Sequence, residues 1–192
     1  QIAEFARTIH DEASRLNRLV SDLLLLDRME ANQLPIRRQR VDLNALAAAA
    51  TERVRGAAPE RTFRLALDPA LPPTMADPER LTQALINLLG NAIKYSPAAE
   101  PIEIATRRAG DRLVMSVADR GDGIPADQLE SIFTRFHRLA TRSARLTAGA
   151  GLGLPIVREI ARLHGGEAWA ESAAGAGSTF HIALPLDEGG RG

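Results

Sequence analysis

Cysteine is absent from the 192-residue chain, and neither sign of charge is in excess, because 24 basic residues balance 24 acidic ones. Without cysteine the chain has no disulfide framework, no thiolate zinc site and no cysteine nucleophile, which agrees with a reducing compartment. Without net charge, no overall field draws it to nucleic acid or to an acidic membrane. We therefore expect no nucleic-acid partner.

Long apolar runs and several well-known catalytic patterns are also missing. No run approaches the ~20 residues of a membrane helix, and no signal peptide opens the chain, so we expect a soluble, cytoplasmic polypeptide. The four histidines show neither metal-binding spacing nor a Ser-His-Asp arrangement. The glycine-rich segment Gly149–Leu154 matches neither the Rossmann fingerprint nor the Walker loop.

The first thirty residues carry a heptad repeat of apolar side chains. The repeat predicts a long helix with one apolar seam, which partner helices would cover. Glu12 interrupts the seam, so a bundle with room for a polar layer is favoured over a two-stranded coiled coil. The seam consists of Ile2, Ile9, Leu16 and Leu23, with Phe5, Leu19 and Leu26 at the intervening positions.

From Arg61 onward the periodicity changes between strand and helix. Asp77-Pro78 places a capping residue before a proline at the first helical position, and a second helix begins near Leu154. Asp42 is a predicted cap for a helix that begins near Leu43. Strands that follow one another without a helix between them predict an α+β fold, a two-layer sandwich in which helices cover a mixed sheet. The predicted strands are 62–68, 102–106, 113–118, 167–171 and 179–184.

Asn87, Asn91 and Lys94 lie on the predicted helix that begins at Pro78. Residues four apart project from the same side, so the two amide oxygens can converge on a hard cation and the phosphates it carries. The structural alternative is a pair of buried amides that bond to nearby backbone. Lys94 favours the binding site, because it adds a donor for phosphate oxygens.

Two glycine-containing segments follow. Residues 119–123, Asp-Arg-Gly-Asp-Gly, come after a predicted strand, where such residues usually only form a turn. They lack the alternate oxygen ligands and the closing glutamate of a calcium loop. Gly149–Leu154 runs into a helix, so glycine amides and a helix N-terminus can face a triphosphate. Either segment alone is a weak signal.

Four segments, 87–96, 119–124, 133–136 and 149–154, occur in a fixed order. Their order resembles the N, G1, F and G2 boxes of sensor histidine kinases, which share a wider ATPase family with gyrase B, Hsp90 and MutL. The resemblance covers roughly Asp77 to the end of the chain. Upstream, Glu12–Leu24 resembles the second helix of the dimeric four-helix bundle in these kinases, and Leu34–Leu43 resembles their linker and first short strand.

The resemblance implies four parts of the chain. Residues 1–32 correspond to the second helix of an incomplete dimerisation bundle and 33–42 to a linker. Residues 43–187 correspond to a catalytic ATP-binding domain, and 188–192 to a flexible tail. ATP and Mg²⁺ are the implied ligands.

The adenine end of the implied site is formed around Asp119. By the resemblance Asp119 accepts a hydrogen bond from the adenine amino group, which would favour adenine over guanine. Tyr95 forms a wall of the adenine pocket, and Gly121 and Gly123 allow backbone and base to approach closely. Thr179 helps Asp119 to hold the base through water.

The phosphate end of the implied site is formed around Asn91, the magnesium ligand. Asn87 supports it at the same site and is a candidate second ligand. The implied catalytic residues are Asn91, Lys94 and Arg135, with Arg135 as a phosphate contact. The arginine-rich stretch with Arg138, Arg142 and Arg145 occupies the place of the ATP lid. The other implied nucleotide contacts are Ile124, Gly149, Gly151, Leu152, Gly153 and Leu154.

The implied function is transfer of the ATP γ-phosphoryl group to a bundle histidine, for relay to a response-regulator aspartate. The implied partners are a second copy of the chain, through the bundle helix, and a receiver domain. The alternative is a nucleotide-binding regulator or an anti-sigma-factor-like serine kinase; the bundle helix and linker favour the first interpretation. The chain would be the cytoplasmic portion of a bacterial membrane-bound sensor, with membrane contact only through upstream segments.

His10 precedes an acidic residue on the predicted helix, as a phosphorylated histidine of this family does. The family pattern continues with Leu, Arg, Thr or Ser, and Pro, whereas Ala13, Ser14 and Arg15 occur here and the first proline is Pro35. We therefore interpret His10 as an ordinary helix residue and expect the phosphoacceptor upstream. The chain is expected to bind ATP without labelling itself.

Overall fold

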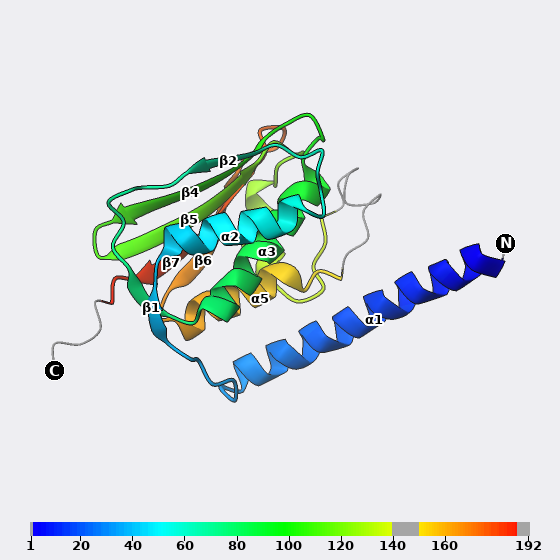
Figure 1. Ribbon diagram of the computed structural model, residues 1–192, viewed down its shortest axis with the longest axis horizontal. Helices are drawn as coiled ribbons and strands as arrows, with labels where there is room; N and C mark the ends of the chain where they lie inside the picture. Colours follow the sequence, from blue (N-terminus) through cyan, green and yellow to red (C-terminus); the bar gives the residue numbers. More distant parts are fainter. Residues whose placement is uncertain (1, 140–149, 188–192) are drawn as a thin grey trace.

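The computed structural model describes residues 2–139 and 150–187. A 29-residue helix, α1 (Ile2–Glu30), extends beyond the rest of the molecule at its N-terminal end (Figure 1). Inside the predicted linker, β1 (Gln39–Val41) pairs antiparallel with β3 (Thr74–Ala76). The predicted tail at 188–192 lies outside the described residues. None of the helices described combines the length and the apolar character needed to cross a membrane.

Five strands form the main sheet, in the order β2-β4-β5-β7-β6. The β2–β4 pair is parallel and the other neighbours are antiparallel, so the sheet is mixed. Each predicted strand is present, with the first shortened and the others slightly longer than expected. Their bounds are β2 Phe63–Ala66, β4 Ile102–Ala109, β5 Arg112–Asp119, β6 Glu167–Ser172 and β7 Ser178–Pro185.

Three helices cover one face of this sheet: α2 (Leu43–Arg55), α3 (Pro78–Tyr95) and α5 (Gly153–Leu163) (Figure 1). Two short 3₁₀ turns, η1 (Ala126–Gln128) and η2 (Ser131–Phe133), lie between β5 and α5 in the chain. The predicted α+β two-layer sandwich preceded by a long helix is confirmed.

Alternation along the strands separates the core from the second face of the sheet. Met115 and Val117 of β5 are fully buried in the core beneath the helices, whereas Ser116 points to the other face. There its Oγ lies 2.8 Å from Nδ1 of His181 on β7, and the His181 ring stacks on Trp169 of β6 with ring centroids 4.7 Å apart.

Aspartate caps begin two of the covering helices, as the sequence predicts. Oδ1 of Asp42 accepts the backbone N–H of Asn44 at 2.8 Å and begins α2. Oδ1 of Asp77 accepts the N–H groups of Glu79 and Arg80, both at 3.1 Å, and begins α3. The cap fixes the start of the helix that carries the asparagines.

Asp77 also joins two segments that are distant in sequence. Its Oδ2 accepts the N–H of Arg37 at 2.9 Å, which ties the chain before β1 to the start of α3. Its own N–H donates to Nε2 of His164, at the C-terminal end of α5, at 2.9 Å. Nδ1 of His164 lies 2.7 Å from the carbonyl oxygen of Ile160, so the buried imidazole is bonded at both nitrogens.

The apolar seam of α1 divides between two environments. Near the C-terminal end, Leu26 and Met29 are fully buried against the domain, where α1 packs on α5. Leu19 and Leu23 are partly buried against the same core. The other described apolar side chains of α1 are mostly exposed: Phe5 (68%), Ile9 (69%), Leu16 (56%), Val20 (57%) and Leu24 (52%).

Candidate functional site

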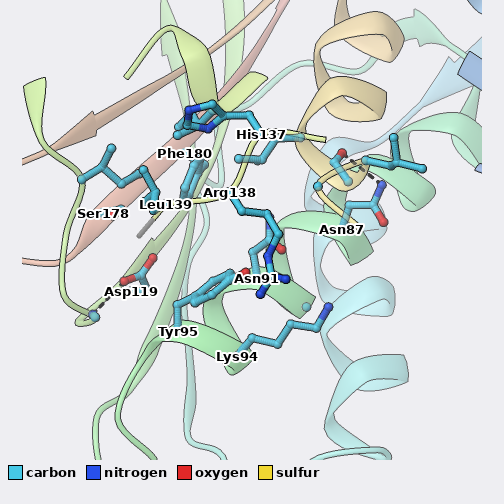
Figure 2. Close-up of a pocket in the computed structure, with 18 of the residues that line it drawn as sticks. Asn87, Asn91, Lys94, Tyr95, Asp119, His137, Arg138, Leu139, Ser178 and Phe180 are labelled. Atoms are coloured by element: carbon cyan, nitrogen blue, oxygen red, sulfur yellow. Dashed lines mark hydrogen bonds between the residues drawn. The ribbon is translucent and has the colours of Figure 1, made fainter. Parts of the chain in front are cut away.

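A cavity of about 640 Å³ lies beside α3 and collects the motif residues from several elements (Figure 2). Its walls are α3, the loop after β5, the segment before α5 and the start of β7. Most of the predicted site residues line it: Asn87, Asn91, Lys94, Tyr95, Asp119, Gly121, Gly123, Ile124, Gly151, Leu152, Gly153 and Leu154. Gly149 lies outside the described residues.

Helical spacing places Asn87, Asn91 and Lys94 on the cavity side of α3. Nδ2 of Asn87 donates to the carbonyl oxygen of Gly153 at 3.3 Å, which connects α3 to the first turn of α5. The sequence left open that the asparagine amides only bond to nearby backbone. The side-chain nitrogen of Asn87 does form such a bond. Its amide oxygen is the atom with ligand chemistry for a hard cation.

Asp119 ends β5 and is buried, with 6% of its surface exposed. Its Oδ1 accepts the backbone N–H of Gly121 at 2.8 Å. Burial raises the pKa of Asp119 above its ordinary value, and this outweighs the backbone N–H groups of Gly121 and Ser178 and the charge of Arg120, which act to lower the pKa. The carboxylate is therefore a fixed acceptor in a poorly solvated wall of the cavity.

Two glycines of the loop after β5 have no room for a side chain. A Cβ on Gly121 would lie 2.4 Å from the carbonyl oxygen of Tyr95, and one on Gly123 would lie 2.0 Å from that of Ala173. Gly123 also has φ +71°, in the left-handed region that favours glycine. Both glycines thus allow backbone segments that shape the cavity to approach each other closely, and close approach of the base to this loop stays a prediction.

The N-terminus of α5 opens toward the cavity. Its N-cap, Leu152, makes no side-chain capping bond, and Leu152, Gly153 and Leu154 line the cavity. The first N–H groups of a helix lack partners within the helix and carry the positive end of its dipole. This wall is suited to anionic oxygens.

Two predicted residues do not reach the cavity. Arg135 is not among the lining residues, and its side chain forms ion pairs with Asp27 and Glu30 of α1. Thr179 lies between Ser178 and Phe180, which line the cavity, so strand alternation turns Thr179 to the other face of β7. The position assigned to Thr179 is occupied by Ser178.

The wall that follows η2 consists of His137, Arg138 and Leu139. Arg138 belongs to the stretch predicted as the lid, whereas His137 and Leu139 were not singled out by the sequence. Figure 2 draws Asn91, Lys94 and Arg138 on one side of the cavity and Asp119 on the other. Leu19 and Asp22 of α1 also line the cavity, and no local pattern could have predicted a contribution from so distant a segment. His10 is exposed and is not among the lining residues.

Comparison with known proteins places these features in a family. Residues 76–188 match the family described as histidine kinase-, DNA gyrase B- and HSP90-like ATPase. The circadian input-output histidine kinase CikA of Synechococcus elongatus is 35% identical, over 95% of this chain and 25% of that protein. The sensor protein kinase WalK of Staphylococcus haemolyticus is 34% identical, over 95% of this chain and 30% of its own length.

A solved structure supports the same relationship. Full-length ShkA in complex with AMPPNP aligns with a TM-score of 0.84 at 29% identity, over 96% of this chain and 38% of that one. The chain thus spans less than half of each of these relatives. CikA is named as a histidine kinase and WalK as a sensor protein kinase, so the alternative function is not favoured. The chain belongs to the histidine kinase-, DNA gyrase B- and HSP90-like ATPase family, in which it carries the ATP-binding catalytic domain of a sensor histidine kinase.

Proposed function

We propose that the cavity binds ATP with Mg²⁺ and presents the γ-phosphoryl group to a histidine of the parent protein's helical bundle. The observation that supports this most directly is the division of one cavity into two ends. A buried carboxylate, Asp119, stands at one end, and the amides and cations of Asn91, Lys94 and Arg138 stand at the other.

Asp119 recognises the adenine base in this proposal. Its carboxylate accepts a hydrogen bond from the exocyclic amino group of adenine, whereas guanine presents a carbonyl oxygen at that position. Tyr95 and Phe180 line the same cavity and provide apolar surface. Ser178, rather than Thr179, is the hydroxyl on this wall.

The phosphate end suits a magnesium-bound triphosphate. The amide oxygen of Asn91 is a hard ligand for Mg²⁺, and the amide oxygen of Asn87 is a candidate second ligand. Mg²⁺ takes most of its remaining ligands from phosphate and water. Mg²⁺ would supply charge neutralisation there. Lys94 and Arg138 offer donors to phosphate oxygens, and the first N–H groups of α5 face the same space.

In the proposed reaction the acceptor is a histidine of the bundle and not a residue of the cavity wall. A bundle imidazole nitrogen attacks the γ-phosphorus in line, a nitrogen–phosphorus bond forms, the bond to the bridging oxygen breaks, and ADP leaves. We infer that the parent protein is a dimer through the bundle helix and passes the phosphoryl group to a receiver-domain aspartate. We also infer that this portion is the cytoplasmic part of a bacterial membrane-bound sensor. Here the domain positions the nucleotide and neutralises its charge.

Titration calorimetry with ATP and GTP tests the nucleotide assignment. In Mg²⁺ we expect ATP binding and little GTP binding. Asp119→Ala should weaken ATP binding by about tenfold or more, because it removes a charged acceptor in a buried site. Asn91→Ala should remove the Mg²⁺ dependence while part of the binding remains. Asp111→Ala, at an exposed hairpin carboxylate, is the matched control and should bind ATP normally. Unchanged ATP affinity in Asp119→Ala would remove the adenine assignment.

A further inference from the structure

Arg135 is held by two carboxylates on the last turn of α1. Its Nη1 donates to Oδ1 of Asp27 at 2.8 Å and its Nε donates to Oε1 of Glu30 at 3.1 Å. Its enclosed Nη2 lies 2.9 Å from Oε2 of Glu30. The arginine side chain is the more enclosed partner, at 28% exposed, against 56% and 52% for the acidic side chains. A planar guanidinium that meets two carboxylates is fixed in orientation as well as in place.

The two carboxylates are unfavourable for α1 itself. Asp27 and Glu30 lie in the last turn of the helix, where the dipole favours positive charge and opposes negative charge. Their positions are therefore not explained by the stability of α1. Arg135, which comes from the segment between η2 and α5, supplies the compensating charge.

Arg135 directly precedes the wall of the nucleotide cavity formed by His137, Arg138 and Leu139. Phe136, between them, has φ +62°, a backbone conformation that a bulky residue adopts only when its surroundings hold it there. The Phe136 side chain is 61% exposed and so provides little anchorage. Its N–H donates to the carbonyl oxygen of Gly151 at 3.1 Å. The turn into the wall is thus held by this backbone bond, by a bond from the His137 N–H to the carbonyl oxygen of Thr134 at 3.4 Å, and by Arg135.

The same face of α1 reaches the cavity directly. Leu19 and Asp22 line the cavity, and Leu26 and Met29 are buried one and two turns further along. Helix α1 therefore packs along the side of the nucleotide site, and the Arg135 ion pairs lie at the end of that contact.

We propose that Asp27 and Glu30 are positioning residues of the nucleotide site. Acting through Arg135, they hold residues 136–139 in the conformation that forms the cavity wall. This inference rests on the ATP binding proposed above, and it adds a segment of the bundle helix to the machinery that binds nucleotide.

Calorimetric ATP titration of the full chain tests the proposal, with Arg135→Gln and the double variant Asp27→Asn/Glu30→Gln. Each should weaken ATP binding by about three- to tenfold, and the triple variant should be no weaker than Arg135→Gln alone, because the three residues act as one unit. Arg162→Gln is the matched control. Arg162 also reaches the end of α1, at the carbonyl oxygen of Met29 and Oδ1 of Asn32, both at 3.3 Å, but it comes from α5 and does not precede the wall.

A charge exchange separates positioning from general destabilisation. The exchange is made in an Asp27→Asn background. There Arg135→Glu should weaken ATP binding, and the further substitution Glu30→Arg should recover part of the lost affinity. Unchanged or higher affinity in the neutral variants overturns the proposal, and so does an equal loss in Arg162→Gln, which would show that docking of α1 alone matters. A wild-type chain that binds no ATP overturns the proposed function as well.

Discussion

Protonation of Asp119 has opposite effects on folding and on binding. Burial raises its pKa above the ordinary value of 3.8, so the folded protein takes up this proton at a higher pH than the unfolded chain. Between the raised pKa and 3.8, a falling pH therefore stabilises the fold through this group. Over the same window adenine loses its carboxylate acceptor.

We expect ATP affinity to fall as the pH drops through this window, while the melting temperature rises relative to that of Asp119→Asn. The asparagine variant cannot titrate and serves as the reference for both quantities. Calorimetry and thermal melts across pH measure the two effects. ATP affinity with the same pH profile in the wild type and in Asp119→Asn would contradict the assignment.

His164 titrates with the opposite sign. Burial lowers its pKa below 6.5, and the charge of Arg38 adds to this, while the bond with the Ile160 carbonyl and the charge of Asp77 act in the other direction. The unfolded chain binds the proton first, so stability falls as the pH drops below 6.5 and continues to fall down to the lowered pKa. Burial also lowers the pKa of His181, which contributes with the same sign.

Urea unfolding at about pH 7.5 and about pH 5.5 measures this loss for His164. His164→Gln should have a smaller difference in unfolding free energy between the two conditions than the wild type. It should also lose about 1 to 2 kcal/mol near neutral pH, because two buried bonds are disturbed. His10→Gln, at an exposed histidine, should retain the wild-type difference.

The sequence predicted those site residues whose placement depends on local geometry. Asn87, Asn91 and Lys94 follow from helical spacing, which does not depend on the rest of the fold. Arg135 could not be placed in this way, because its ion pairs join residues more than a hundred positions apart. Ser178 lines the cavity and Thr179 does not, because neighbouring residues of a strand point to opposite faces of the sheet, and the sequence alone does not fix which face meets the cavity.

Among the elements, α1 has an apolar stripe that the domain does not cover. Leu16 and Val20 lie on it, while Leu19, Leu23 and Leu26 turn toward the domain. An exposed apolar stripe of this length is a surface for association. We expect the chain to self-associate through it.

Sedimentation over a concentration range should show this association. Leu16→Lys/Val20→Lys should shift the chain to monomer without changing ATP affinity, since neither residue lines the cavity. A chain that begins at Val41 should be monomeric throughout. A wild-type chain that stays monomeric at high concentration would contradict this prediction.

The type and order of the helices and strands were predictable, because helix-capping residues and the alternation of apolar and polar residues in strands are visible in short segments. Asp42 and Asp77 each precede a helix that they cap. The parallel pairing of β2 with β4 was not predictable in this way, because it joins strands separated in the chain by β3 and α3. Which apolar side chains of α1 are buried and which are exposed depends on where the domain docks on the helix. A heptad pattern alone does not predict that position.

At the scale of the whole molecule, the chain holds a nucleotide cavity without an acceptor imidazole directed into it from α1. His10 is exposed on α1 and is not among the cavity residues. Since transfer depends on in-line placement, we expect incubation with γ-labelled ATP to give no acid-labile phosphohistidine. A bundle fragment that carries the proposed acceptor histidine should restore labelling in trans. Self-labelling that His10→Gln abolishes would identify His10 as the acceptor.

The bond from the Arg37 N–H to Asp77 sets the length of a tether. Helix α1 ends at Glu30, so residues 31–36 are the stretch between its end and the backbone N–H that is bonded to Asp77. Fully extended, this stretch spans about 20 Å. If α1 undocks, the domain can move away from the end of α1 only as far as this stretch allows, so its length limits which bundle histidines the γ-phosphate can reach. Lengthening residues 31–36 would therefore change which histidine the domain can reach before it changes how tightly the nucleotide binds.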